Sequence, residues 1–298
     1  MKPELLNRGD CIGLVATAKP VIRAEIAPFK ALMQEWGLTV LEGQHLYDSH
    51  HHFAGTDENR AKDFIDMWQN PKVKAIFCAR GGYGSIRMLK HFPENLFKSN
   101  SKWLIGYSDI TTLHMALNSH NISSLHGPMA LNAFVTNTQT SHNFKRLEKA
   151  LFHGEISVDL RKCESINAKP FEGKLLGGNL SLIAASLGAP EQLNTKNSVL
   201  FIEEIDEYLY HFDRIMQTLD RAQLFKPLTA LIVGGMSKMK DNEVKFGRDA
   251  KEIILDICKP YDFPIIFNFP AGHGAKNFPI YMGSICKFEK GILSQSLE

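Results

Sequence analysis

Two buried apolar runs, Val73–Ala79 and Trp103–Ile105, each end in a tight glycine turn that leads directly into a helical pattern. An earlier run, Asp10–Ala16, has the nearly continuous apolar character of a strand that is covered on both faces. Strands that alternate with helices in this way predict a parallel sheet with helices on both of its faces. Such sheets bind ligands beyond the carboxyl ends of their strands, which is where both glycine turns fall.

The second half of the chain departs from this rhythm and predicts a second unit. Around residues 151–170 the alternation stops, and Glu155–Leu160 and Arg161–Lys169 are interpreted as a crossing segment rather than a packed element. Strand and helix patterns resume at residue 171, and Gly283–Glu289 is predicted as an edge strand. We therefore predict an α/β protein in three parts: a doubly wound, mostly parallel, flavodoxin- or Rossmann-like domain at 1–145, a linker at 146–172, and a smaller α/β domain at 173–298.

The charge balance and the apolar pattern exclude several classes of partner. Lys and Arg number 34 against 32 Asp and Glu, so a net charge of +2 gives no reason to expect nucleic acid or an anionic membrane as partner. No apolar run approaches the ~20 residues of a membrane span, and the N-terminus lacks the pattern of a signal peptide. The five cysteines are far apart without C-x-x-C pairing, which predicts buried free thiols in a cytoplasmic protein.

The sharpest local feature is the turn Gly106–Asp109, which places Ser108 between a strand and a helix. A serine on such a turn projects its hydroxyl above the sheet, and the N–H groups of the following helix face the same space. The usual motif is G-x-S-x-G, whereas the fifth position here is Ile110. From the turn alone, Ser108 is either a nucleophile or the cap of the helix that follows.

A serine nucleophile needs a base, and the base needs a carboxylate to orient it. Among the twelve histidines, His273 lies in a glycine-flanked loop directly after the strand pattern Pro264–Asn268, where it is either a base or a surface histidine. Glu203 is the first polar residue after an apolar strand, and Glu204 would face the opposite side. The chain order of Ser108, Glu203 and His273 is that of the α/β-hydrolases, which is weak support by itself.

The turn Arg80–Gly84 resembles a phosphate-binding glycine loop but matches neither dinucleotide-binding nor P-loop spacing. It is interpreted as a plain turn or as a source of a second backbone N–H donor beside Ser108. No metal-ligand spacing is present, and the run His50–His52 is read as a solvated loop or a metal-binding patch. We expect no metal in catalysis and no cofactor.

Six ordered motifs and a final glycine–histidine pair resemble those of one enzyme family across residues 9–285. They are Phe53–Arg60, Arg80–Gly84, Gly106–Thr111, His126–Met129, Gly177–Leu180, Phe201–Glu207 and Gly272–His273. Together they resemble the LD-carboxypeptidases, a family of serine peptidases. Glu204, where the family more often has Asp, and the region Tyr208–Arg214 depart slightly from the pattern.

The resemblance implies a function and a set of functional residues. It implies a nucleophile at Ser108, completed by Glu203 and His273, and an oxyanion hole from the backbone N–H groups of Gly82 and Asp109. It also implies an active site in a groove between the two domains of a homodimeric protein. The implied reaction removes the terminal D-alanine of a cytoplasmic murein tetrapeptide through an acyl-enzyme during cell-wall recycling.

A carboxypeptidase also needs a cationic or N–H-rich pocket for the terminal carboxylate of its substrate. Arg80 and Lys276 lie near the expected mouth, and the sequence does not decide between them. Tyr83 and Asn179 are further candidate substrate contacts, and capping of the following helix is an equal alternative for Asn179.

Three other functions remain open at this level. The first is hydrolysis of peptidyl- or aminoacyl-nucleotides, as in the microcin C immunity proteins, although the chain has no insertion between Ser108 and Glu203. The second is non-catalytic binding of a small ligand by the α/β sheet. The third is a nucleotide-dependent enzyme that uses the Arg80–Gly84 turn.

Overall fold

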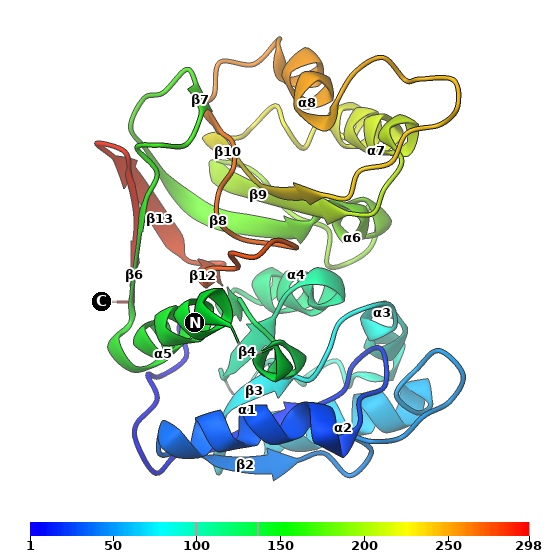
Figure 1. Cartoon of the computed structure of the whole chain (residues 1–298), viewed down its shortest axis with the longest axis vertical. Helices are drawn as coiled ribbons and strands as arrows, with labels where there is room; N and C mark the ends of the chain where they lie inside the picture. The colour runs from blue at the N-terminus through cyan, green and yellow to red at the C-terminus, as the bar shows by residue number, and fades with distance from the viewer. Residues whose placement is uncertain (99–100, 136, 298) are drawn as a thin grey trace.

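Two β-sheets form the framework of the protein. The computed structural model describes residues 1–98, 101–135 and 137–297. Figure 1 shows the two sheets one above the other, with helices α4 (Thr111–Ser119) and α5 (Thr138–His153) at the level between them. The chain is a mixed α/β protein whose sheets are rich in parallel strands, as the sequence predicts.

The first sheet has six strands, and all but one run parallel. Their order is β12-β5-β4-β3-β1-β2, and only β12 is antiparallel to its neighbour. From β2 to β5 this is the flavodoxin-like order, whose topological switch point lies between β1 and β3. The strands are β1 (Cys11–Val15), β2 (Thr39–Glu42), β3 (Val73–Cys78), β4 (Trp103–Gly106), β5 (Ser124–His126) and β12 (Ile280–Met282).

Helices cover both faces of this sheet. Helix α1 (Arg23–Glu35) and α5 pack on one face, and α2 (Asp57–Gln69) and α4 pack on the other. Short turns of helix complete the connections: α3 (Ser85–Met88), η1 (Leu89–His91), η2 (Ser108–Ile110) and η3 (Ala130–Phe134). Apolar side chains on both faces explain why the strand sequences are continuously apolar rather than alternating.

The second sheet has eight strands in the order β6-β14-β13-β8-β9-β10-β11-β7. Its four consecutive strands β8 to β11 are parallel, and the flanking strands are antiparallel. The strands are β6 (Glu155–Asp159), β7 (Ser165–Ile166), β8 (Phe171–Asn179), β9 (Ser198–Ile205), β10 (Ala230–Ser237), β11 (Ile265–Ile266), β13 (Ile285–Glu289) and β14 (Ile292–Ser296).

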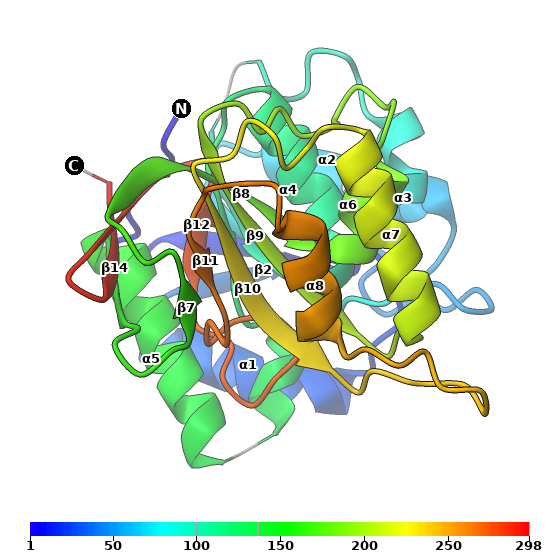
Figure 2. The same cartoon turned by 90° about the horizontal axis from the view of Figure 1, so that it is seen from above.

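Three helices cover the outer face of the second sheet: α6 (Leu180–Ala185), α7 (Leu209–Arg221) and α8 (Ala250–Cys258). Figure 2 shows α7 and α8 lying over β9 and β10. The inner face of this sheet, including Phe201 and Ile232, packs in the same apolar core as α5 and one face of the first sheet. A continuous core therefore joins the two sheets.

Two sequence predictions about the ends of the second sheet are wrong. The predicted crossing segment contains two strands: β6, whose alternating buried and exposed residues pair with β14, and the short β7 within Arg161–Lys169, which pairs with β11. The predicted edge strand at Gly283–Glu289 is β13, which lies inside the sheet between β14 and β8. Both errors come from pairing between distant segments, because β6 joins β14 and β13 joins β8, and such pairing leaves no local signal. The division into domains at 145 and 172 stays a prediction.

Within the described residues, no helix is long and apolar enough to cross a membrane. All five cysteines are free thiols, and Cys78, Cys258 and Cys286 are buried.

Candidate active site

Ser108 lies on a strained turn at the carboxyl end of β4. Its φ of 64° is in the left-handed region, which residues other than glycine seldom adopt. The preceding Tyr107 is extended, and Ser108 begins the short helix η2. This sharp change from strand to helix is the backbone form that exposes a nucleophilic serine in other α/β enzymes.

His273 lies between Ser108 and Glu203, which are distant in the sequence. The distance from His273 Nε2 to Ser108 Oγ is 3.0 Å, and from His273 Nδ1 to Glu203 Oε2 it is 2.6 Å. An ionised carboxylate only accepts hydrogen bonds, so Nδ1 of the neutral ring carries the proton and Nε2 accepts from the Ser108 hydroxyl. The structure thus brings the three predicted side chains into one hydrogen-bonded chain.

Glu203 lies on β9 with its side chain fully buried. A Cβ on Gly272 would lie 2.8 Å from Glu203 Cβ, so only glycine fits opposite this carboxylate. Glu204 faces away from His273, because successive strand residues alternate. It accepts hydrogen bonds from Asn179 and Ser181 instead.

The loop that carries His273 is held from several sides. Asn277 Oδ1 accepts a hydrogen bond from Gly272 N at 3.0 Å, and the Ser237 hydroxyl donates to the His273 carbonyl. Asn143 on α5 accepts from Asn277 N at 3.3 Å and donates to Ala275 O at 3.0 Å. The loop is therefore tied to β10 and to α5 at once, which fixes the direction of the imidazole. Sequence analysis missed these two asparagines, because their partners lie far away along the chain.

The glycine turn after β3 packs directly against Ser108. A Cβ on Gly81 would lie 3.2 Å from Ser108 Cβ and 3.4 Å from Ser108 Oγ. Gly82 has a φ of 125°, a conformation that favours glycine. The structure therefore places the backbone of this turn beside the serine, and Asp109 directly follows Ser108. The oxyanion role of the two N–H groups stays a prediction.

A buried arginine, Arg60, holds this turn in place. Its guanidinium donates to Thr17 O at 2.5 Å and to Gly84 O at 2.9 Å, and it pairs with Asp57. Asp109 adds a second tie, because its Oδ2 accepts from Ser85 N at 2.8 Å. Burial raises the pKa of the Asp109 carboxyl. The motif Phe53–Arg60 ends in this residue, and Arg60 precedes Phe64 by four residues, so the cation lies on the buried face of α2.

A buried histidine supports the strand that ends in Ser108. His114 on α4 bonds Gly106 O through Nε2 at 3.0 Å and Ser124 Oγ through Nδ1 at 2.8 Å. A carbonyl only accepts, so Nε2 carries the proton and the ring is neutral with Nδ1 as acceptor. Burial lowers the pKa of His114 to about 4 from 6.5, and burial also lowers the pKa of the neighbouring His126.

This arrangement predicts that the protein loses stability in mild acid. Between pH 6.5 and 4 His114 is protonated in the unfolded chain but not in the folded chain. The free energy of unfolding therefore decreases as the pH falls from 6.5 towards 4, and His114 has no such effect above pH 6.5. Inside that window, one such histidine changes the free energy of unfolding by about 1.4 kcal/mol per pH unit. Urea unfolding at several pH values measures the slope. His114→Gln is expected to reduce the slope, and an unchanged slope would contradict the assignment.

The remaining predicted contact residues lie in different environments. Arg80 is half-buried and donates to Pro20 O at 3.4 Å, whereas Tyr83 is 47% exposed beside Phe53. Asn179 is 3% exposed and caps α6 by accepting from Leu182 N, while its amide donates to Glu204. The Asn179 side chain is thus engaged in capping α6 and in its bond to Glu204. Lys276 is exposed.

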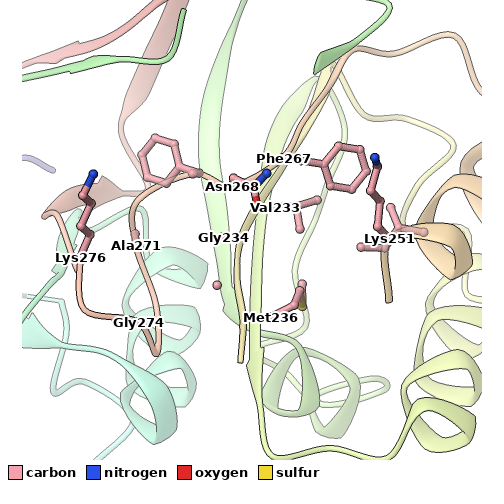
Figure 3. Close-up of a pocket in the computed structure, with 12 residues that line it drawn as sticks. Val233, Gly234, Met236, Lys251, Phe267, Asn268, Ala271, Gly274 and Lys276 are labelled. Carbon is pink, nitrogen blue, oxygen red and sulfur yellow. The ribbon is translucent and has the colours of Figure 1, made fainter. Parts of the chain in front are cut away.

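A pocket of about 320 Å³ opens at the carboxyl ends of β10 and β11, next to the His273 loop. Figure 3 shows Lys276 and Lys251 on opposite sides of it, with Gly234 and Ala271 between them. A second pocket, of about 400 Å³, lies beside Tyr107 and Asn277. In the part of the chain that the structure describes, no three His, Cys, Asp or Glu side chains are grouped to hold a metal ion.

Comparison with known families identifies both halves of the chain. Residues 12–127 match the model of the LD-carboxypeptidase N-terminal domain, and residues 172–288 match that of the LD-carboxypeptidase C-terminal domain. The first match covers the strands β1 to β5, and the second covers β8 to β13. Ser108 lies in the first matched region, and Glu203 and His273 lie in the second.

Bacterial relatives match nearly the whole chain. A probable murein peptide carboxypeptidase of Bacillus subtilis is 29% identical over 95% of this chain and 90% of its own. The murein tetrapeptide carboxypeptidase of Pseudomonas aeruginosa is 25% identical over 89% of each. Among solved structures, muramoyltetrapeptide carboxypeptidase from Oxalobacter formigenes has a TM-score of 0.84 at 26% identity, covering 95% of this chain and 97% of that one. The microcin C7 self immunity protein MccF, in complex with aspartyl sulfamoyl adenosine, has a TM-score of 0.91 at 19% identity, with 100% and 99% covered.

Proposed function

Because the chain belongs to the LD-carboxypeptidase family and is a serine carboxypeptidase, we propose that it removes the terminal D-alanine from a murein tetrapeptide. The observation that carries the proposal is the hydrogen-bonded chain from Ser108 through His273 to Glu203. A serine hydroxyl in line with a neutral imidazole and a buried carboxylate is the arrangement that acyl transfer requires.

In the first step Ser108 Oγ attacks the carbonyl carbon of the peptide bond before D-alanine. His273 Nε2 takes the hydroxyl proton as the new C–O bond forms. The carbonyl oxygen becomes an oxyanion, which the N–H groups of Gly82 and Asp109 stabilise. The C–N bond then breaks, the imidazolium returns its proton to the departing amine, and the peptide remains as an ester on Ser108.

In the second step water hydrolyses the ester by the same route in reverse. His273 takes a proton from the water and gives it back to Ser108 Oγ, so the enzyme is regenerated. Glu203 keeps the imidazole in the required tautomer and stabilises the imidazolium. The buried position of this carboxylate supports the role: Oε2 accepts from the ring and the backbone N–H of His273, and Oε1 has no hydrogen-bond partner among the described residues.

The site draws its residues from both parts of the chain, which supports a groove between domains at 1–145 and 173–298, joined through 146–172. We further propose that the enzyme acts in the cytoplasm, as a homodimer, in cell-wall recycling. Arg80, Tyr83 and Lys276 remain proposed contacts with the peptide, whereas Asn179 is assigned to the cap of α6.

A second candidate is hydrolysis of an aminoacyl-nucleotide, which the likeness to MccF favours through the fold alone. Incubation of the purified protein with L-Ala-D-Glu-diamino acid-D-Ala and, separately, with an aminoacyl-nucleotide tests the two. We expect release of D-alanine from the peptide and no cleavage of the nucleotide. Cleavage of the nucleotide alone would replace the peptidase assignment by the second one.

A further inference from the structure

Removal of a C-terminal residue places a geometric limit on the cation that binds the terminal carboxylate. Three covalent bonds separate the carboxylate carbon from the carbonyl carbon that reacts, a span of at most about 4 Å. A charge-assisted hydrogen bond adds about 3 Å. The cation must therefore lie close to the reacting carbon, on the side where Ser108 and the glycine turn meet.

Lys19 lies on that side, in the loop that follows β1. Its aliphatic stem crosses Gly82, since a Cβ on Gly82 would lie 2.6 Å from Lys19 Cγ and 3.0 Å from Lys19 Cε. The Lys19 N–H also donates to Gly81 O at 3.5 Å. Gly81 in turn packs against Ser108. The Lys19 stem thus lies over Gly82, next to Gly81, which contacts the Ser108 side chain.

The charge of Lys19 is available to a ligand. Among the described residues, none accepts a hydrogen bond from the Lys19 ammonium or forms an ion pair with it. The loop after β1 and the turn after β3 also flank the switch point of the first sheet, where a crevice forms beyond the strand ends. A cation, a glycine turn and Ser108 therefore meet at one edge of the sheet.

Arg80 and Lys276, the two cations that the sequence suggested for the terminal carboxylate, are placed less suitably to bind it. The Arg80 guanidinium is directed at Pro20 O, to which it donates. Lys276 lies beyond the His273 loop at the rim of the 320 Å³ pocket, as Figure 3 shows. Neither side chain crosses the turn that touches Ser108.

We propose that Lys19 binds the terminal carboxylate of the substrate and so makes the enzyme a carboxypeptidase rather than an endopeptidase. The inference rests on the proposed function. Its test compares two substrates, the tetrapeptide with a free D-alanine carboxylate and the same peptide with a D-alanine amide. Three proteins are compared: the wild type, Lys19→Met, which keeps the stem over Gly82, and Lys226→Met, at an exposed lysine between α7 and β10, as the matched control.

For the wild type we expect kcat/KM to favour the free carboxylate. Lys19→Met is expected to lower kcat/KM for the carboxylate substrate about 10- to 100-fold and to leave the amide substrate nearly unchanged. Lys226→Met should change neither value, and Lys19→Arg should restore part of the preference.

Equal losses on both substrates in Lys19→Met, or an equal loss of the preference in Lys226→Met, would overturn the inference and leave the peptidase function intact. A wild type that releases no D-alanine from the tetrapeptide would instead overturn the proposed function, and the inference with it.

Discussion

Replacement of Ser108 by alanine is expected to lower kcat for D-alanine release by about 10⁴- to 10⁶-fold. The variant loses the only oxygen within hydrogen-bond distance of His273 Nε2 among the described residues, so no acyl-enzyme forms. The fold should persist, because the side chain shrinks by one oxygen atom and no core contact is removed. Turnover of the tetrapeptide at saturating concentration measures the effect, together with the melting temperature.

Ser119→Ala is the matched control for this substitution. Ser119 lies at the end of α4, where its hydroxyl donates to Ala116 O and, among the residues that the structure describes, to nothing else, so kcat should stay at the wild-type value. Turnover by Ser108→Ala at a rate near that of Ser119→Ala would rule out the nucleophile assignment.

Glu203→Gln is expected to lower kcat by about 10⁴-fold while the protein remains folded. A glutamine amide has nearly the same shape, but it removes the negative charge that stabilises the imidazolium. It also allows the His273 ring to carry its proton on Nε2, the atom that must accept from Ser108. The kcat of the variant at neutral pH measures the loss.

Glu204→Gln provides the contrast, since the two acids are adjacent on β9 and face opposite ways. Glu204 accepts three hydrogen bonds from Asn179 and Ser181, so the substitution should lower the free energy of unfolding by about 1–3 kcal/mol and leave kcat within a few-fold of wild type. If Glu204→Gln lost activity and Glu203→Gln kept it, the carboxylate would have been assigned to the wrong residue.

The sequence carried enough information to predict a parallel sheet in the first half and the three side chains of the site, but it gave no sign of β5 or of β12, which joins the first sheet from the C-terminal half. Ser108 and His273 both stand at glycine-marked ends of apolar runs, and Glu203 is the first acid after one. In a parallel sheet such positions converge on one edge, which brings Glu203 and His273 together at the second sheet, whereas their contact with Ser108 at the end of β4 depends on how the two sheets pack. The strained φ of Ser108 agrees with the turn that the residues Gly106–Asp109 predicted.

The remaining features depend on contacts that no local pattern records. Strands β6, β13 and β14 pair across most of the second half, so their places in the sheet were misjudged. Asn143 and Asn277 support the His273 loop through bonds between distant segments. Lys19 was overlooked because its importance comes from the turn that its stem crosses. Arg60 was named only within a motif, because its bonds to Thr17 O and Gly84 O join segments that are distant along the chain.

The most direct test of the central claim is covalent labelling of the wild-type protein with a serine-directed fluorophosphonate, followed by mapping of the adduct by mass spectrometry. An alcohol made reactive by a hydrogen-bonded imidazole displaces fluoride from the reagent, whereas ordinary serines do not react at a comparable rate. We expect one adduct per chain, located on Ser108 and greatly slowed in Glu203→Gln. A wild-type protein that stays unlabelled, or that carries the adduct on another serine, would contradict the account.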